Sequence, residues 1–311
     1  MMLKSRVVLA PEVSSTGREA LRDIKDAEPK VKLKIDRVGV RGIRTRFPIK
    51  SPWGTLIYEA IVDAYVELPS DKRGVHMSRN IEAFAEVIYE ARLREHSTTV
   101  EGLLAEVAEK MLKKHDYTQK VEVVARTAYF FDVGPRKGIS EPVDVVIRVV
   151  KSRDGEEVRE LSISLLGLTV CPCAQMTFSL KEGTELHKSP SHTQRARLTA
   201  TITLKNTGRV PMINELAELL VSAFSAPVMG LLKRNDEYEV IKKGFEKPRF
   251  IEDVVRHALD AISRYLVKRG FPPDARIKVE VESYESIHPY NAYACREATL
   301  EELMLEASTS R

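Results

Sequence analysis

The order of strand-like and helix-like segments constrains the fold of this chain more than any other feature. The first half shows two β-rich segments, two amphipathic helical segments and two more β-rich segments, at 31–49, 55–68, 81–88, 100–112, 120–133 and 142–151. The second half repeats this order at 157–170, 195–205, 216–224, 254–266, 275–284 and 291–295. The repeat lies in the architecture and not in the residues. It predicts antiparallel sheets with helices on one face, which is the α+β class.

Local signals predict where these elements and the larger units begin and end. Ser78, Thr99 and Asn214 are expected near helix N-caps, and Gly270 is expected to end the last long helix. Asp154-Gly155 is a tight-turn sequence that joins the two halves. The predicted units are an N-terminal segment at 1–30, a first unit at 31–153, a second unit at 154–298 that carries the functional site, and a tail at 299–311.

Composition excludes several classes of protein. The 311 residues are 43% hydrophobic, which is enough for a sizeable core, and contain no long apolar run or leader-like N-terminus. We therefore expect a soluble cytoplasmic protein that does not enter a membrane. Three cysteines argue against a disulfide framework. The net charge of +4, with acids and bases interspersed, argues against a nucleic-acid partner.

Two of the cysteines stand together in "LTVCPCAQMTF", at the end of a predicted strand. Cys171 and Cys173 are followed, after a polar loop, by His192 at the start of the returning strand. A thiolate needs a metal ion or an imidazolium nearby, and both sulfurs are too close for comfortable chelation of one ion. The pattern is consistent with a metal site that uses one cysteine, and equally with buried, inert thiols. Cys295 is expected to pack in the core.

Two further clusters of polar residues follow in the second half. "ESYESIHPYNAYACRE" places Glu285 and His288 at a strand end and the turn after it, where a solvated pair is the simpler interpretation. "MGLLKRNDEYEV" places Lys233, Arg234 and Glu237 between the two C-terminal helices, and an exposed polar loop is the simpler interpretation.

Taken together, five ordered motifs of the second half resemble those of one enzyme family. The segments "CPCAQ", "SHTQRA", "APVMGLLKRNDE", "KPRFIEDVVR" and "ESIHPYNAYA" resemble the type IB GTP cyclohydrolases, and their form is similar to the archaeal branch. "RGVHMSRNIEAF" adds a match in the first half, so the resemblance covers about residues 35–298. It implies two tandem tunnelling-fold units, each an antiparallel sheet with two helices on one face. Two departures are a long loop before His192 and Thr193 where the bacterial enzymes usually have Asn.

The resemblance implies a role for each matched residue of the metal site and the catalytic site. Cys171, His192 and Glu237 match metal ligands, with Fe(II) expected and Zn(II) or Mn(II) as substitutes. Glu252 and His288 match acid–base residues. Cys173 is expected to tune the metal or to transfer a proton, and packing is an alternative role for it.

The resemblance also implies how the substrate is held. Glu285 matches the carboxylate that binds the guanidine-like edge of the base. Candidates for the triphosphate are Arg195, Lys233, Arg234, His76, Ser78 and Arg79. Arg41, Arg44 and Arg46 are further candidates, although a solvated strand face is the simpler interpretation of these three.

The implied activity is hydrolysis of the guanine imidazole ring of GTP with release of formate. The product would be a 7,8-dihydroneopterin phosphate, either the 2′,3′-cyclic phosphate or the triphosphate, as the first step of methanopterin- or folate-type pterin biosynthesis. GTP is the expected partner. A homodimer or homotetramer with sites near subunit interfaces is also expected from the family.

Two alternatives come from other classes of protein. Another tunnelling-fold enzyme, such as a nitrile reductase, would use the cysteine as a nucleophile, but no His–Glu pair lies next to the cysteine loop. A metal-stabilised RNA-binding module would need a basic stripe with exposed aromatic residues. With 6% aromatic residues and balanced charge, the chain does not supply one.

Overall fold

One antiparallel sheet runs through the computed structural model, which describes residues 24–51, 54–94, 98–132 and 140–309. Its strand order is β1-β2-β3-β4-β5-β6-β8-β9, with the short β7 paired to β5. The strands are β1 (Ile35–Ser51), β2 (Gly54–Leu68), β3 (Lys120–Asp132), β4 (Ser140–Ser152), β5 (Glu157–Val170), β6 (Thr193–Lys205), β7 (Ala226–Pro227), β8 (Arg276–Ser283) and β9 (Ala292–Thr299). Because β4 and β5 are paired, the sheet continues across the predicted unit boundary.

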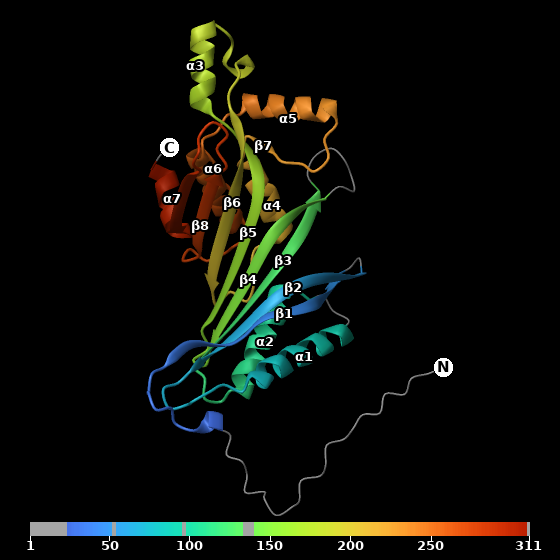
Figure 1. The fold of residues 1–311 in the computed structure, drawn as a ribbon, viewed down its shortest axis with the longest axis vertical. Coiled ribbons are helices and arrows are strands. Elements are labelled where there is room, and N and C mark those ends of the chain that lie inside the picture. Colours follow the sequence, from blue (N-terminus) through green and yellow to red (C-terminus); the bar gives the residue numbers. More distant parts are fainter. Residues whose placement is uncertain (1–23, 52–53, 95–97, 133–139, 310–311) are drawn as a thin grey trace, which may run out of the picture.

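A helix lies at each of the four places that the periodicity predicts, and the described residues form three further helices. The helices are α1 (Met77–Leu93), α2 (Val100–Lys114), α3 (Pro172–Glu182), α4 (Ile213–Ser222), α5 (Arg234–Glu246), α6 (Ile251–Lys268) and α7 (Leu300–Thr309), with 3-10 turns η1 (Ile24–Asp26) and η2 (Leu186–Lys188). Helices α1 and α2 cover the part of the sheet drawn in blue and green, and α4 and α6 cover the other part (Figure 1). The expected α+β architecture is confirmed.

The core lies between the sheet and these helices because residues alternate between the two sheet faces. On β5, Leu161 and Ile163 are buried against the helices, while Ser162 and Ser164 point to the other face. We call this second, largely polar face the open face. There the Thr199 hydroxyl bonds to that of Ser164 at 3.0 Å. The alternation directs apolar side chains to the helices and leaves hydroxyl groups on the open face.

A glycine allows the segment after α4 to pack closely on the sheet. Gly167 on β5 lies under the ring of Phe224, which is 1% exposed. A Cβ atom at Gly167 would come within 2.1 Å of that ring. The absence of a side chain at this position is therefore what permits the aromatic ring to pack on the strand.

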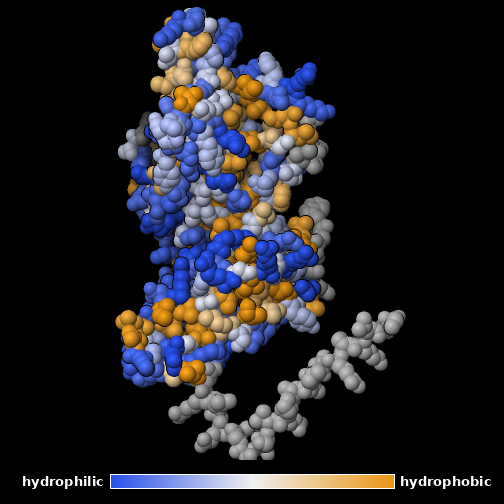
Figure 2. All heavy atoms as spheres, viewed as in Figure 1, coloured by the Kyte–Doolittle hydropathy of each residue, from blue (hydrophilic) through white to orange (hydrophobic). Residues whose placement is uncertain are grey.

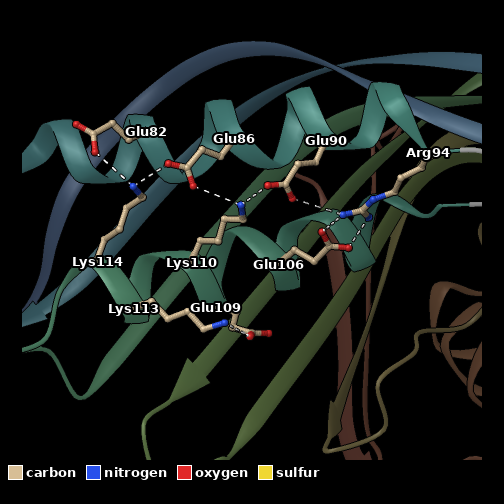
Figure 3. Close-up of polar contacts among 9 residues, drawn as sticks. All are labelled: Glu82, Glu86, Glu90, Arg94, Glu106, Glu109, Lys110, Lys113 and Lys114. Carbon is tan, nitrogen blue, oxygen red and sulfur yellow. Dashed lines mark hydrogen bonds and ion pairs between the residues drawn. The ribbon is translucent and has the colours of Figure 1, made fainter.

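Helices α1 and α2 are joined by a series of ion pairs along their exposed sides (Figure 3). Lys110 Nζ lies 2.6 Å from Glu90 and 3.3 Å from Glu86. Lys114 contacts Glu86 at 2.8 Å and also Glu82. These shared carboxylates connect the pairs into a network, which is the arrangement in which surface ion pairs contribute most.

Helix ends match the sequence signals in part. Thr99 caps α2 by accepting a hydrogen bond from the Gly102 amide at 3.2 Å, and Gly270 follows α6 with a φ of 65°. Ser78 lies near the N-cap of α1, at the second helical position, as expected, whereas Asn214 is not the cap of α4, because that helix already begins at Ile213. The residues before these two helices make no side-chain cap bond.

Three other expectations need correction. The segment between Cys173 and His192 is not a loop throughout but contains α3, because Pro172 occupies the first helical position and Gly183 ends the helix with a φ of 64°. The segment from Arg234 onward is helix α5 and not a loop. Cys295 is exposed and not in the core, since it lies on the edge strand β9.

The structure describes most of the C-terminal segment and little of the N-terminal one. Residues 1–23 of the predicted N-terminal segment lie outside the described residues, as do 310 and 311. Most of the predicted tail forms α7, which packs on α6 and β9.

No helix within the described ranges is long and apolar enough to span a membrane. Hydrophobic residues are spread over the middle and the lower end of the face in Figure 2. On α3, Met176, Phe178 and Leu180 are exposed.

Candidate metal centre at the ends of β5 and β6

Cys171 and His192 are neighbours because β5 ends where β6 begins. The Cys171 amide donates to the His192 carbonyl at 3.2 Å, and the Ser191 hydroxyl donates to the Cys171 carbonyl at 2.7 Å. Cys171 is also the N-cap of α3, and its Sγ accepts from the Ala174 amide at 3.5 Å. The thiol therefore sits at a helix N-terminus, where the helix dipole favours negative charge. Figure 1 shows α3 projecting from this end of the sheet.

A glutamine joins this pair to a carboxylate on the neighbouring strand. His192 Nδ1 lies 3.0 Å from Gln194 Oε1, and Gln194 Nε2 donates to Glu285 Oε1 at 3.4 Å. The Ser283 hydroxyl donates to the same carboxylate oxygen. Because an amide oxygen only accepts, His192 Nδ1 is the donor in this contact, which leaves Nε2 as the acceptor of the neutral ring. An oriented imidazole of this kind, beside a thiol, fits a metal ligand.

The start of α6 lies at the same end of the molecule. The Arg249 amide donates to the Val170 carbonyl at 3.0 Å, which fixes the chain just before α6 against the end of β5. Glu252 is exposed in the first turn of α6 and lines a cavity of about 530 Å³ between α6, β9 and α7. The ring of His288, in the turn after β8, stacks on Tyr290 with centroids 5.1 Å apart.

Glu237, the third predicted ligand, does not form a ligand cluster with Cys171 and His192. It is exposed near the start of α5, whereas Gly244 of the same helix packs on Val170, beside Cys171. Seven helical residues separate the two positions, a rise of about 10 Å. Among the residues that the structure describes, no three His, Cys, Asp or Glu side chains lie close enough to hold a metal ion. A ligand set that includes Glu237 stays a prediction.

The cations proposed for phosphate in the second half are exposed near this end. Arg195 is on the open face, and its carbonyl accepts from the Tyr284 amide at 2.8 Å, next to Glu285. Lys233 and Arg234 lie at the start of α5, where the Lys233 amide donates to Asp236 at 2.9 Å. Cys173 is exposed on the first turn of α3.

His76, Ser78 and Arg79 lie at the opposite end of the sheet. Arg79 donates to the Lys114 carbonyl at 3.0 Å, and Arg153, in the turn before β5, donates to the carbonyl of the next residue, His115. From that turn β5 runs 14 residues to Cys171, a length of about 45 Å. One chain therefore does not bring these three residues to the candidate metal centre.

Sequence reasoning missed two glutamines of this site. Gln194 stands inside the "SHTQRA" motif, but its contact with Glu285 spans 91 positions of sequence. Gln175 stands inside "CPCAQ" and is fully buried, and its Nε2 donates to the Phe245 carbonyl at 3.0 Å, which joins α3 to α5. The motifs contained both residues, and only their position in the fold shows what they touch.

Comparison with solved structures defines the class of fold. The uricase from Arthrobacter globiformis matches with a TM-score of 0.55 over 87% of this chain and 95% of that chain. The two sequences are 12% identical, so the likeness concerns the fold alone. The chain is thus an α+β protein whose long antiparallel sheet is arranged as in that uricase.

Comparison of sequences then defines the family. The family described as "Type I GTP cyclohydrolase folE2" matches residues 21–294, and the chain belongs to it. A relative from Aeropyrum pernix named "GTP cyclohydrolase MptA" is 39% identical over 93% of this chain and 99% of its own length. A second relative with this name, from Methanobrevibacter smithii, is 32% identical over 92% of this chain and 98% of its own.

Proposed function

We propose that this chain is a metal-dependent GTP cyclohydrolase of pterin biosynthesis. It hydrolyses the guanine imidazole ring of GTP, releases formate and forms a 7,8-dihydroneopterin phosphate. Beside the family, the observation that supports this most is the hydrogen-bonded series His192–Gln194–Glu285. It connects a candidate metal ligand to a candidate base-binding carboxylate, and a cyclohydrolase needs both at one site.

We propose Cys171 and His192 as ligands of an Fe(II) ion, with Zn(II) or Mn(II) as substitutes. Thiolate and imidazole are donors that suit these ions, and Glu237 is the proposed third ligand. When bound, such an ion would lower the pKa of water to about 7 and so would supply hydroxide at neutral pH. Gln194 holds the His192 ring in the orientation and tautomer that this role needs.

Glu285 binds the base, and the residues around it donate and accept protons. A carboxylate can accept two N–H groups from the guanidine-like edge of guanine, and the hydroxyl of Ser283 and the amide of Gln194 fix its position. His288 and Glu252 are the proposed acid–base residues, with Cys173 as a further candidate. All six residues belong to elements that end or begin at the same end of the sheet.

The fold and the placement of the first-half residues support an oligomeric enzyme. We propose that the repeated element order represents two tandem tunnelling-fold units. His76, Ser78 and Arg79 lie about a strand length from Cys171, so they reach the same GTP only from another subunit. A homodimer or homotetramer in the cytoplasm would satisfy this requirement. A nitrile reductase or an RNA-binding module is not favoured, because neither accounts for the family match.

The test is anaerobic incubation of the protein with GTP and Fe(II), followed by a formate assay and mass analysis of the pterin. The product mass distinguishes the cyclic phosphate from the triphosphate. Cys171→Ala and His192→Ala should each abolish metal retention and formate release without loss of fold. Cys295→Ala is the matched control, because this exposed thiol lies on β9. Full metal content in both ligand variants would refute the metal site.

A further inference from the structure

The first half of the sheet carries a cavity lined by arginines. Its volume is about 730 Å³, and Arg44, Arg46, Arg92 and Arg126 line it. Arg44 and Arg126 are both in register with Ile61 of β2, so these strand residues share the open face. Glu59 is the carboxylate among the lining residues. The cavity is therefore strongly cationic.

The charges of these arginines are only partly compensated. Arg46 Nε donates to Glu59 at 3.0 Å, and Arg126 donates to Asp63 at 2.8 Å. Arg44 and Arg92 make no ion pair or hydrogen bond with any residue in the described part of the chain. Two guanidinium groups thus line one cavity without a carboxylate partner of their own, and an anion that enters the cavity would offset their charge.

We propose that this arginine cavity binds a polyphosphate chain. Guanidinium groups bind phosphate oxygens through paired N–H donors, and they do so better than ammonium groups. The cavity has the volume of a typical small-ligand site, about 300–1,000 Å³. Its arginines come from β1, β3 and α1, so a ligand that reaches several of them needs several linked anionic groups. A chain of phosphates satisfies this geometry.

The cavity is separate from the candidate metal centre of the same chain. Arg126 of β3 is in register with Val146 of β4, and Val146 is in register with Ser162 of β5. Cys171 lies nine residues beyond Ser162, which is about 30 Å along an extended strand. The proposal therefore goes beyond the proposed catalytic site and does not depend on it.

The experiment measures binding of inorganic tripolyphosphate to the full-length, metal-free protein by calorimetry at low ionic strength. The main variant is Arg44→Ala/Arg92→Ala, which removes the two uncompensated guanidinium groups and leaves no carboxylate without its partner. It should weaken binding at least about tenfold, which corresponds to about 1.4 kcal/mol. Arg276→Ala, a strand arginine paired with Glu297 in the second half, is the matched control and should bind like the wild type.

Three results would overturn the proposal: no saturable binding to the wild type, unchanged binding to the double variant, or equal weakening in Arg276→Ala. GTP turnover then identifies the source of the phosphates. If tripolyphosphate competes with GTP and the double variant has a raised KM for GTP, the cavity binds the triphosphate of a nucleotide that is held at a partner subunit's active site. Binding without either effect indicates free polyphosphate. Since binding is measured without metal or turnover, its result is independent of the cyclohydrolase test.

Discussion

Replacing Gln194 by alanine should weaken metal binding while the fold is retained. The side-chain amide is the acceptor for His192 Nδ1 and a donor to Glu285. Without it, the imidazole loses the contact that fixes its tautomer and ring orientation. The loss of such a supporting contact typically reduces metal affinity about 10- to 100-fold. This corresponds to about 1.4–2.8 kcal/mol.

Gln194→Glu separates the two functions of this amide. A glutamate keeps an oxygen acceptor for His192 Nδ1, so metal affinity should remain near that of the wild type. It loses the N–H donor and places a second carboxylate beside Glu285. Since like charges at this distance repel, we expect GTP binding to be weakened strongly in this variant.

The assay is a titration of metal-free protein with Fe(II) under anaerobic conditions, followed by GTP binding to the loaded protein. Gln119→Ala is the control, because Gln119 is an exposed glutamine at the opposite end of the sheet. Metal affinity of Gln194→Ala equal to that of the wild type would refute the orienting role. Retained GTP binding by Gln194→Glu would refute the link to Glu285.

Three further predictions concern stability. Burial lowers the pKa of His115 to about 4, so the free energy of unfolding should fall by about 3 kcal/mol as the pH falls from 6.5 to 4. His115→Gln should flatten this pH dependence, which urea denaturation at several pH values measures. Gly167→Ala should destabilise the fold by about 3 kcal/mol because its Cβ meets the Phe224 ring, and a compensating Phe224→Leu should recover part of the loss in thermal denaturation. Lys110→Ala should lower Tm slightly at low salt and not at 1 M salt, because Lys110 contacts exposed carboxylates whose attraction salt screens. An equal loss of Tm at both salt concentrations would indicate that the side chain contributes through packing instead.

The sequence by itself determined the long strands, the four helices that cover the sheet, and their order. A period of two along β5 directs Leu161 and Ile163 to one side, and this alternation is a property of neighbouring residues. Thr99 and Gly270 similarly mark helix ends through their own side-chain and backbone preferences. Interactions within a few residues are sufficient for these predictions, so the α+β class and the repeated order followed from the sequence.

Local signals failed where two structures were locally possible. Pro172 stiffens a strand end and also suits the first position of a helix, and the chain uses the second option to form α3. The sequence around Cys295 predicts a core residue. Its strand β9 is at the edge of the sheet, however, and Cys295 is exposed. Whether a strand is central or at an edge depends on pairing across the whole chain.

Only the tertiary structure decided which residues of the candidate site meet. The pairing of β6 with β8 places Gln194 beside Glu285, 91 positions away, whereas Glu237 on α5 forms no ligand cluster with Cys171 and His192. The length of β5 keeps Arg79 and Cys171 at opposite ends of one sheet. The family motifs name these residues but contain no distances. Distances between remote residues are set by strand register and strand length, because hydrogen bonding between strands fixes both positions along the sheet.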